Sequence, residues 1–179
     1  MAERDNNVVS LFRVIREDWI NHNRDWTLPG FRAIAICRFG QWRMQIQSKI
    51  LRAPFSLLYR FLYRRARNIY GIELPYSVKL GQRVRIEHQG GVVIHGCAEI
   101  GDDCIIRQGV TLGNRYMDRP EEAPIIGNAV NIGAGAKILG NVNVGHRSKI
   151  GANAVVLIDV PQDGVAVGNP AKLKRPHYD

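Results

Sequence analysis

Histidine is well suited to general acid–base catalysis near neutral pH, because its unperturbed pKa is about 6.5. The chain contains five histidines, and His88 has the most suggestive surroundings. It follows Ile86-Glu87 and lies just before an interruption in a regular repeat. Such an interruption can open a niche in an otherwise closed wall. His88 is therefore the candidate general base.

The other histidines and the cysteines are weaker candidates for a catalytic or metal-binding role. His95 follows the same interruption, whereas His22, His146 and His177 are expected at the surface. The three cysteines fit neither a disulfide framework nor a zinc site. Cys104 occupies an inward position of the repeat, where it is expected to pack as a small apolar residue. We expect neither an acyl-cysteine intermediate nor a bound metal.

The repeat that must position His88 has a period of six residues. From Leu80 onward a large aliphatic residue recurs on this period, and a small or β-branched residue lies two positions before it. This period is neither the 3.6 of a helix nor the 2 of a long strand, and it indicates very short strands joined by tight corners. It predicts a mainly β fold over residues 71–165, a parallel β-helix of about four triangular coils. Residues 166–179 are expected to form a C-terminal tail.

Residues 1–70 are expected to form a short α-helical region. The apolar spacing predicts helices over Val8–Trp19, Phe31–Leu51 and Pro54–Ile69. Pro54 would suit the first turn of the last helix.

Most of the positive charge lies in this region. The chain has 25 Lys+Arg against 16 Asp+Glu, a net +9, and no acidic residue occurs between Asp25 and Glu73. The arginines could form a solvated face on a packed helix, or they could contact an anionic membrane surface or a lipid-linked substrate. Nucleic acid is not expected as a partner, because no recognition motif accompanies the charge.

The start of the chain and its apolar segments argue against a secreted protein and against a membrane-spanning one. The polar start of the chain carries no visible secretory signal. The longest apolar stretches are far shorter than the roughly 20 residues that span a bilayer. A cytoplasmic protein is expected, with the inner face of the membrane as an open alternative.

The region from Gly71 to Arg175 resembles the hexapeptide-repeat acyltransferases. It is similar to the serine acetyltransferase group and, more closely, to colanic-acid-type polysaccharide O-acetyltransferases. The resemblance implies a left-handed parallel β-helix and transfer of an acetyl group from acetyl-CoA to a hydroxyl. The matching stretches are Ile86–Ile94, Gln108–Asn114, Gly133–Asn141 and Gly168–Ala171.

The resemblance also assigns roles at the site. The catalytic histidine of the family falls on His88, which would take the proton of the acceptor hydroxyl and return it to the sulfur of CoA. Glu73 falls where the family usually has an aspartate that orients this histidine. Glu87, beside His88, also replaces an aspartate of the family and is expected to bind the acceptor.

The loop over residues 114–124 is expected to bind the acceptor. In serine acetyltransferases an Arg-His pair here helps to hold serine, but this chain has Glu122-Ala123 at the corresponding place. Loss of the arginine argues against the carboxylate of serine and for a sugar hydroxyl. Arg115 or Arg119 could replace the lost arginine.

The family binds CoA in a groove between neighbouring β-helices of a homotrimer. By this resemblance Thr111 and Gly113 lie near the thioester, and two lysines of the tail could meet the phosphates. The residues expected to bind the cofactor are Thr111, Gly113, Gly133, Ala134, Gly151, Ala152, Lys172 and Lys174.

These features favour an acetyl-CoA-dependent O-acetyltransferase that modifies a sugar in exopolysaccharide or capsule biosynthesis. The alternative is serine O-acetylation for cysteine biosynthesis, with the same fold and a different acceptor. A non-catalytic hexapeptide-repeat scaffold is a third reading, which predicts that His88 can be replaced without consequence.

Overall fold

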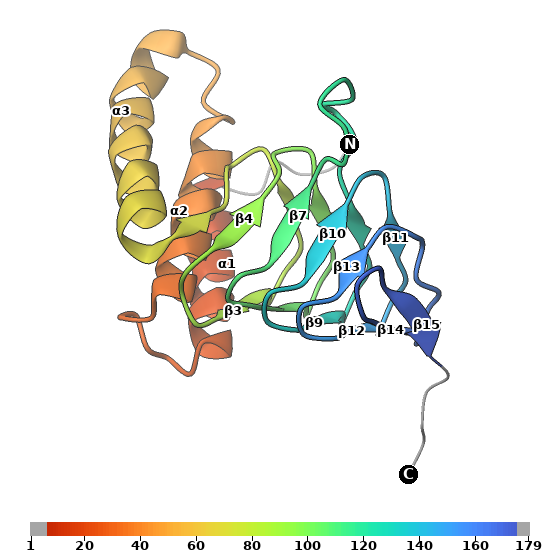
Figure 1. The fold of residues 1–179 in the computed structure, drawn as a ribbon. Helices are drawn as coiled ribbons and strands as arrows, with labels where there is room; N and C mark the ends of the chain where they lie inside the picture. The colour runs from red at the N-terminus through yellow and green to blue at the C-terminus, as the bar shows by residue number, and fades with distance from the viewer. Residues whose placement is uncertain (1–6, 175–179) are drawn as a thin grey trace, which may run out of the picture.

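The computed structural model describes residues 7–174, with side chains from residue 11 onward. It consists of a layer of helices followed by a three-sided prism of short parallel strands (Figure 1). The parallel β-helix expected from the six-residue repeat is confirmed. Residues 175–179 of the expected tail lie outside the described part.

Three sheets form the walls of the prism, and the chain visits them in turn. Sheet A contains β1 (Ile72–Glu73), β4 (Val92–Ile94), β7 (Thr111–Gly113), β10 (Lys137–Leu139) and β13 (Val155–Val156). Sheet B contains β2 (Lys79–Leu80), β5 (Glu99–Ile100), β8 (Ile125–Ile126) and β11 (Asn143–Val144). Sheet C contains β3 (Arg85–Glu87), β6 (Ile105–Arg107), β9 (Asn131–Ile132), β12 (Lys149–Ile150), β14 (Val165–Val167) and β15 (Lys172–Lys174).

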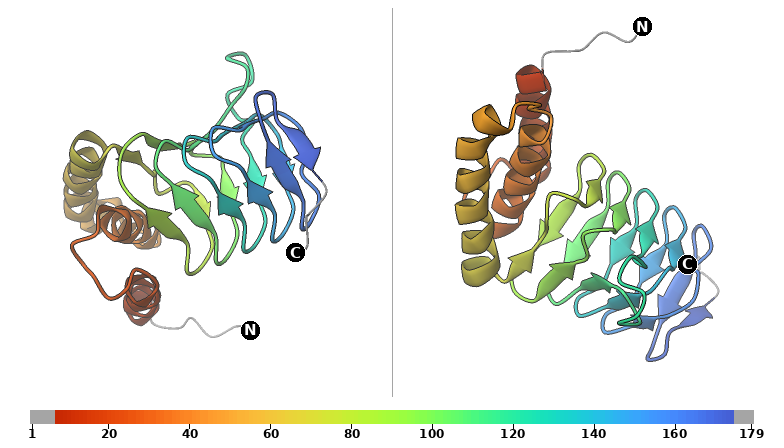
Figure 2. Two further views of the ribbon diagram at one scale, coloured as in Figure 1. Left: turned by 60° about the horizontal axis from the view of Figure 1, so that its bottom comes forward. Right: turned by 90° about the horizontal axis from the view of Figure 1, so that it is seen from above.

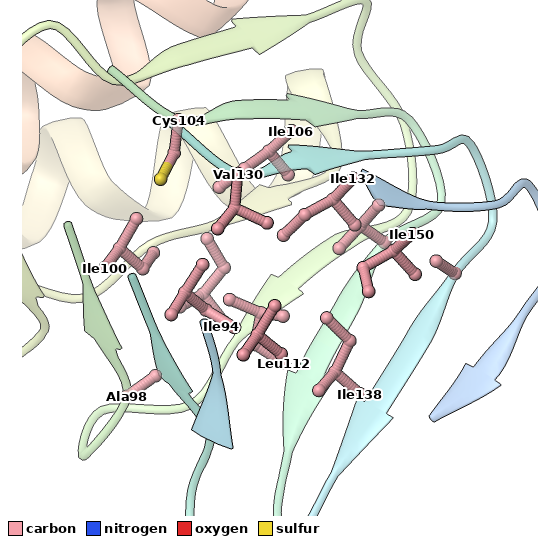
Figure 3. Packing of buried hydrophobic residues seen from close by; sticks show 14 of the residues in the cluster. Ile94, Ala98, Ile100, Cys104, Ile106, Leu112, Val130, Ile132, Ile138 and Ile150 are labelled. Atoms are coloured by element: carbon pink, nitrogen blue, oxygen red, sulfur yellow. The ribbon is translucent and has the colours of Figure 1, made fainter. Parts of the chain in front are cut away.

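Each wall is in register with the six-residue pattern. Ile106 pairs with Ile86 on one side and with Ile132 on the other, so large aliphatic side chains stack along the axis of the prism. Figure 3 shows this column together with the inward-facing Cys104, which is fully buried as expected. Close packing of these repeated contacts is what fixes the coil.

The solenoid extends further than the repeat alone predicts. β14 and the antiparallel β15 complete sheet C, so paired strands continue to Lys174 beyond the boundary expected at residue 165. The reversed direction of β15 ends the parallel stacking at this end of the prism.

The helical layer covers the opposite end of the prism, beside the first coil (Figures 1 and 2). It contains α1 (Asn7–Asn21), α2 (Pro29–Arg43), α3 (Lys49–Arg65) and a π-helical turn, η1 (Ala66–Tyr70). No helix of the described residues is both long enough and apolar enough to cross a membrane.

The expected helix over Phe31–Leu51 is wrong, because α2 ends at Arg43 and α3 starts only at Lys49. The guanidinium carbon of Arg43 lies 4.4 Å from the ring centre of Tyr59 and 4.5 Å from that of Tyr76. This stacking holds the end of α2 against α3 and the first coil. Pro54 therefore lies inside α3 rather than in its first turn.

Candidate active site

His88 lies at the corner where the chain passes from sheet C to sheet A, which we call the C–A edge. It directly follows β3 and has a φ of 66°, in the left-handed region that residues other than glycine seldom adopt. Its side chain is exposed, and the ring has no hydrogen-bond partner among the described side chains and backbone groups. The corner therefore presents a free imidazole at the surface of the prism.

A cavity of about 310 Å³ opens beside His88. One wall is the end of β3, and the other is the connection between α1 and α2. The cavity lining is His22, Asn23, Leu28, Pro29, Gly30, Arg85, Ile86, Glu87, His88 and Gln89.

Glu87 lies between two arginines on the outer face of sheet C. Its carboxylate oxygens are 3.4 Å from Nε of Arg85 and 3.2 Å from Nε of Arg107. Glu87 and Arg85 both line the cavity, so a carboxylate and a guanidinium stand next to His88. This set can bind a small molecule that carries charges of both signs.

Glu73 does not contact His88 within the described chain. It lies on β1, and its Oε1 accepts a hydrogen bond from the hydroxyl of Tyr63 over 3.4 Å. Burial, followed by the neighbouring Glu73 carboxylate, raises the pKa of Tyr63 to about 12, which keeps its hydroxyl protonated as a donor. Tyr63 is a partner that the sequence did not suggest.

Several residues expected to bind CoA share the C–A edge with His88. Gly133 and Ala134 follow β9, and Gly151 and Ala152 follow β12, so both pairs occupy the same corner of successive coils. The coils meet closely here, because a Cβ on Gly133 would lie 2.6 Å from the backbone nitrogen of Ala152.

The two alanines of these corners differ from the two glycines in hydrogen bonding. The N–H groups of Gly133 and Gly151 donate to Ile150 and Ala166 in the next coil. Those of Ala134 and Ala152 have no acceptor within residues 7–174. They are among the backbone donors left for a ligand on this edge.

The remaining expected cofactor residues are spread over the prism. Thr111 begins β7 on the C–A side, and its hydroxyl accepts a hydrogen bond from Nζ of Lys137 over 3.1 Å. Gly113 ends the same strand at the far side of sheet A. Lys172 pairs with Val167 near the C–A edge, whereas Lys174 pairs with Val165 at the other end of β14.

The loop over residues 114–124 projects from the prism between β7 and β8 (Figures 1 and 2). This is the corner between sheets A and B, at the opposite end of the sheet A strands from His88. The loop is held there by contacts such as Cys97 Sγ with Glu121 Oε2 at 3.3 Å. The structure therefore does not bring Arg115 and Arg119 to His88 of the same chain.

Both arginines make local contacts in this loop. The guanidinium carbon of Arg115 lies 5.1 Å from the ring centre of Tyr116, and that of Arg119 lies 5.4 Å from it. Arg119 also forms a 3.3 Å ion pair with Glu122. These contacts hold the arginines on the loop itself.

The surface position expected for His22 is wrong, because this side chain is buried. Its Nδ1 lies 2.7 Å from the carbonyl oxygen of Asp18, and its Nε2 accepts the backbone N–H of Ile86 over 3.4 Å. Burial lowers the pKa of His22 and favours the neutral ring that can do both. The α1 helix thereby holds the edge of β3 two residues before His88.

Comparison with known proteins agrees with this architecture. Residues 123–157 match the bacterial transferase hexapeptide (six repeats) family. A serine acetyltransferase from Helicobacter pylori is 41% identical over 167 residues, which cover 91% of this chain and 93% of that protein. A serine acetyltransferase from Synechococcus elongatus is 40% identical over 145 residues, but the chain spans only 57% of its length.

Solved structures give the same result. The chain is similar to a Brucella abortus serine acetyltransferase in complex with coenzyme A, with 31% identity and a TM-score of 0.79 over 92% of this chain and 68% of that one. It is also similar to a soybean serine acetyltransferase complexed with serine, with 32% identity and a TM-score of 0.76 over 93% and 70% of the two chains.

These similarities overturn one expectation. The preference for a sugar acceptor in polysaccharide biosynthesis is wrong, because the curated relatives and the solved structures are serine acetyltransferases over most of this chain. The absence of an arginine at the corresponding place in the loop over residues 114–124 does not exclude serine, since Arg85 lines the cavity beside His88. This chain belongs to the serine acetyltransferase family of hexapeptide-repeat transferases, whose fold is the left-handed parallel β-helix.

Proposed function

We propose that this protein is an acetyl-CoA-dependent acyltransferase that moves an acetyl group to the hydroxyl of serine. The observation that carries the proposal is the charged cavity beside His88, where Glu87 and Arg85 flank an exposed imidazole. Serine has an ammonium that complements Glu87 and a carboxylate that complements Arg85. Serine would exchange the 3.4 Å contact between Arg85 and Glu87 for contacts with its own two charges, which a neutral sugar cannot do.

His88 acts as the general base in this proposal. It takes the proton of the serine hydroxyl while the oxygen attacks the carbonyl carbon of acetyl-CoA. The tetrahedral intermediate then collapses as the C–S bond breaks, and His88 gives the proton to the sulfur of CoA. The products are O-acetylserine and CoA, so atoms and charge balance without a metal or an acyl-enzyme.

Acetyl-CoA binds along the C–A edge in this proposal. The free N–H groups of Ala134 and Ala152 are available to the pantetheine arm, and Thr111 lies on the same side near the thioester. Lys172 is the tail lysine placed to meet a phosphate, since it lies closer to this edge than Lys174.

The protein is a homotrimer in this proposal, and the arrangement of the loop supports it. Arg115 and Arg119 lie at the far end of sheet A from His88 of their own chain. They can contribute to a site only where a neighbouring prism brings its own C–A edge to them. Glu73 keeps an orienting role toward His88 only if serine or CoA binding draws its carboxylate away from Tyr63.

The test is release of CoA from acetyl-CoA in the presence of L-serine. We expect His88→Asn to lower kcat by at least about 100-fold, the usual scale for loss of a general base. Asparagine tolerates the left-handed backbone of this corner, so the fold should be preserved. The matched control is His95→Asn, which alters an imidazole at a different corner and should keep kcat.

Arg85→Gln tests the acceptor in the same assay. We expect it to raise the KM for serine by roughly tenfold or more and to leave the KM for acetyl-CoA unchanged, because it removes a charge-assisted bond to the carboxylate. Full activity of His88→Asn, or no turnover of serine by the unaltered protein, would show that the proposed function is wrong.

A further inference from the structure

We infer that α3 is an interfacial helix that docks on an anionic lipid surface. This helix forms the outermost layer of the molecule, on the side that faces away from the prism (Figure 2). Only Tyr59 of its side chains is buried. Its outer face has no packing partner within the described chain. This face combines exposed apolar side chains with arginines, which is unusual for a surface helix.

The outer face of α3 is strongly apolar. Phe61 is 63% exposed and Leu57 is 65% exposed, and both belong to one stripe at helical spacing. The members of this stripe are Ile50, Pro54, Leu57, Leu58 and Phe61. A contiguous patch of large apolar side chains on a protein surface indicates an interaction site.

Basic side chains flank this stripe, and acidic ones do not. Arg60 and Arg64 of α3 and Arg67 of η1 follow one another at helical spacing, and none of them forms a salt bridge with any described residue. No acidic residue occurs anywhere from residue 26 to residue 72. The patch therefore offers apolar contact and uncompensated positive charge together.

A groove on the other side of α3 adds to the apolar surface. It has a volume of about 350 Å³ and lies between α2 and the end of α3. Its lining is almost entirely apolar apart from two arginines: Trp26, Phe31, Arg32, Ala35, Ile36, Leu62, Arg65, Ala66 and Tyr70. An acyl chain below an anionic head group complements this combination.

The positive charge of α3 favours binding to anionic lipid over binding to a second copy of this chain. Self-association through α3 would bring arginines against arginines, since the helix has no carboxylate to offer its partner. An anionic bilayer supplies many negative head groups at once, and an amphipathic helix can lie with its apolar face about 5–10 Å deep in the head-group boundary. Docking through α3 leaves the far end of the prism, at β15, directed away from the lipid.

Co-sedimentation of the full chain with vesicles tests this inference. We expect binding to phosphatidylcholine vesicles that contain about 30 mol% phosphatidylglycerol, and little binding to phosphatidylcholine alone. Raising the salt to about 0.5 M should weaken the interaction, because screening shortens the reach of the arginines.

Two sets of variants separate the charge from the apolar stripe. Joint substitution of Arg60→Gln, Arg64→Gln and Arg67→Gln should weaken binding by roughly 100-fold, about fivefold for each residue. The control set, Arg13→Gln, Arg16→Gln and Arg24→Gln, removes the same charge from exposed positions outside α3 and should retain most of the binding.

The pair Leu57→Gln and Phe61→Gln should weaken vesicle binding by at least about tenfold, since each removes buried apolar area at the lipid boundary. Met117→Gln, on the loop over residues 114–124, is the control, because Met117 is also highly exposed. Absence of binding to the anionic vesicles at low salt would overturn the inference. So would oligomerisation that Leu57→Gln and Phe61→Gln abolish in a protein that ignores vesicles.

Discussion

Two histidines with opposite surroundings meet at strand β3. His88 is exposed at the corner after the strand, and His22 is buried against the strand's open edge. The ring of His22 accepts the N–H of Ile86, which has no strand partner on that side. Next to it, Gly30 packs so closely that a Cβ there would lie 2.1 Å from the carbonyl oxygen of Ile86. The position of His88 therefore depends on residues of the helical layer.

His22 should make the stability of the protein depend on pH. Burial lowers its pKa in the folded state, so the unfolded chain binds the extra proton as the pH falls below about 6.5. We expect the melting temperature to fall between about pH 7.5 and pH 5.5, and His22→Gln to flatten this dependence. Glutamine can still accept from Ile86 and donate to the carbonyl of Asp18.

The charged neighbours of His22 also affect how stability depends on pH, so the measurement needs a control. Asp18, Arg85 and Glu87 all act on its pKa, and burial raises the pKa of Asp18 itself. The contribution of Asp18 runs in the opposite direction, because its folded form gains a proton more readily than the unfolded chain. Comparison with His22→Gln leaves Asp18 in place. An unchanged slope in that variant would contradict the role given to His22.

Burial of His22 could not be predicted from its local sequence. It follows α1 at a point where the chain turns, and such positions are usually exposed. What buries it is the first coil of the prism, more than sixty residues away at Ile86. For His88 the sequence predicted a niche where the six-residue repeat is interrupted, and a cavity lies beside this residue in the structure.

At the scale of elements, one buried ion pair connects α1, α2 and the prism. Nε of Arg38 lies 3.0 Å from Oδ2 of Asp18, and both side chains are buried. The same guanidinium donates to the carbonyl oxygens of Leu80 and Gly81 at the end of β2. Both helices are thereby fixed to the first coil through a single arginine.

Arg38→Ala should destabilise the fold by about 3–5 kcal/mol, because it leaves the Asp18 carboxylate buried without a cation. Urea unfolding measures this change. The double variant Asp18→Leu with Arg38→Leu should recover much of the loss, since removing both charges also removes their desolvation cost. If Arg38→Ala costs no more than an exposed substitution such as Arg24→Ala, the pair does not anchor the layer.

The break between α2 and α3 is a helix boundary that could not be predicted from the local sequence. Residues 44–48 contain neither glycine nor proline, so the local sequence permits one continuous helix. The break depends on Arg43, whose guanidinium stacks on Tyr59 and Tyr76 from distant segments. Ser48 then caps the new helix by accepting from the N–H of Leu51.

At the scale of the whole molecule, the helical layer and the prism share one core. Ala33, Ile34 and Cys37 of α2 belong to the same buried cluster as the aliphatic column of the prism. The prism could be predicted from its period, whereas the docking of the helices could not, because it uses single contacts that do not repeat. A continuous core of this kind favours a single cooperative unfolding transition.

Ile132→Ala tests this cooperativity from the middle of the prism. Ile132 is fully buried between Ile106 and Ile150 of the neighbouring coils, so the substitution should cost about 2–5 kcal/mol. All three tryptophans, Trp19, Trp26 and Trp42, lie in the helical region, and their fluorescence reports on that layer. Far-UV circular dichroism reports on the helices and the strands together, so it also follows the prism.

If the layer and the prism unfold together, Ile132→Ala shifts the fluorescence and circular dichroism midpoints in urea by the same amount. Ile158→Ala is the matched control, because Ile158 is 46% exposed and its truncation should change stability by about 0.5 kcal/mol or less. A dichroism midpoint that moves while the tryptophan midpoint stays would show two independent units. The anchoring of β3 by His22 and of β2 by Arg38 would then be too weak to couple the helices to the site.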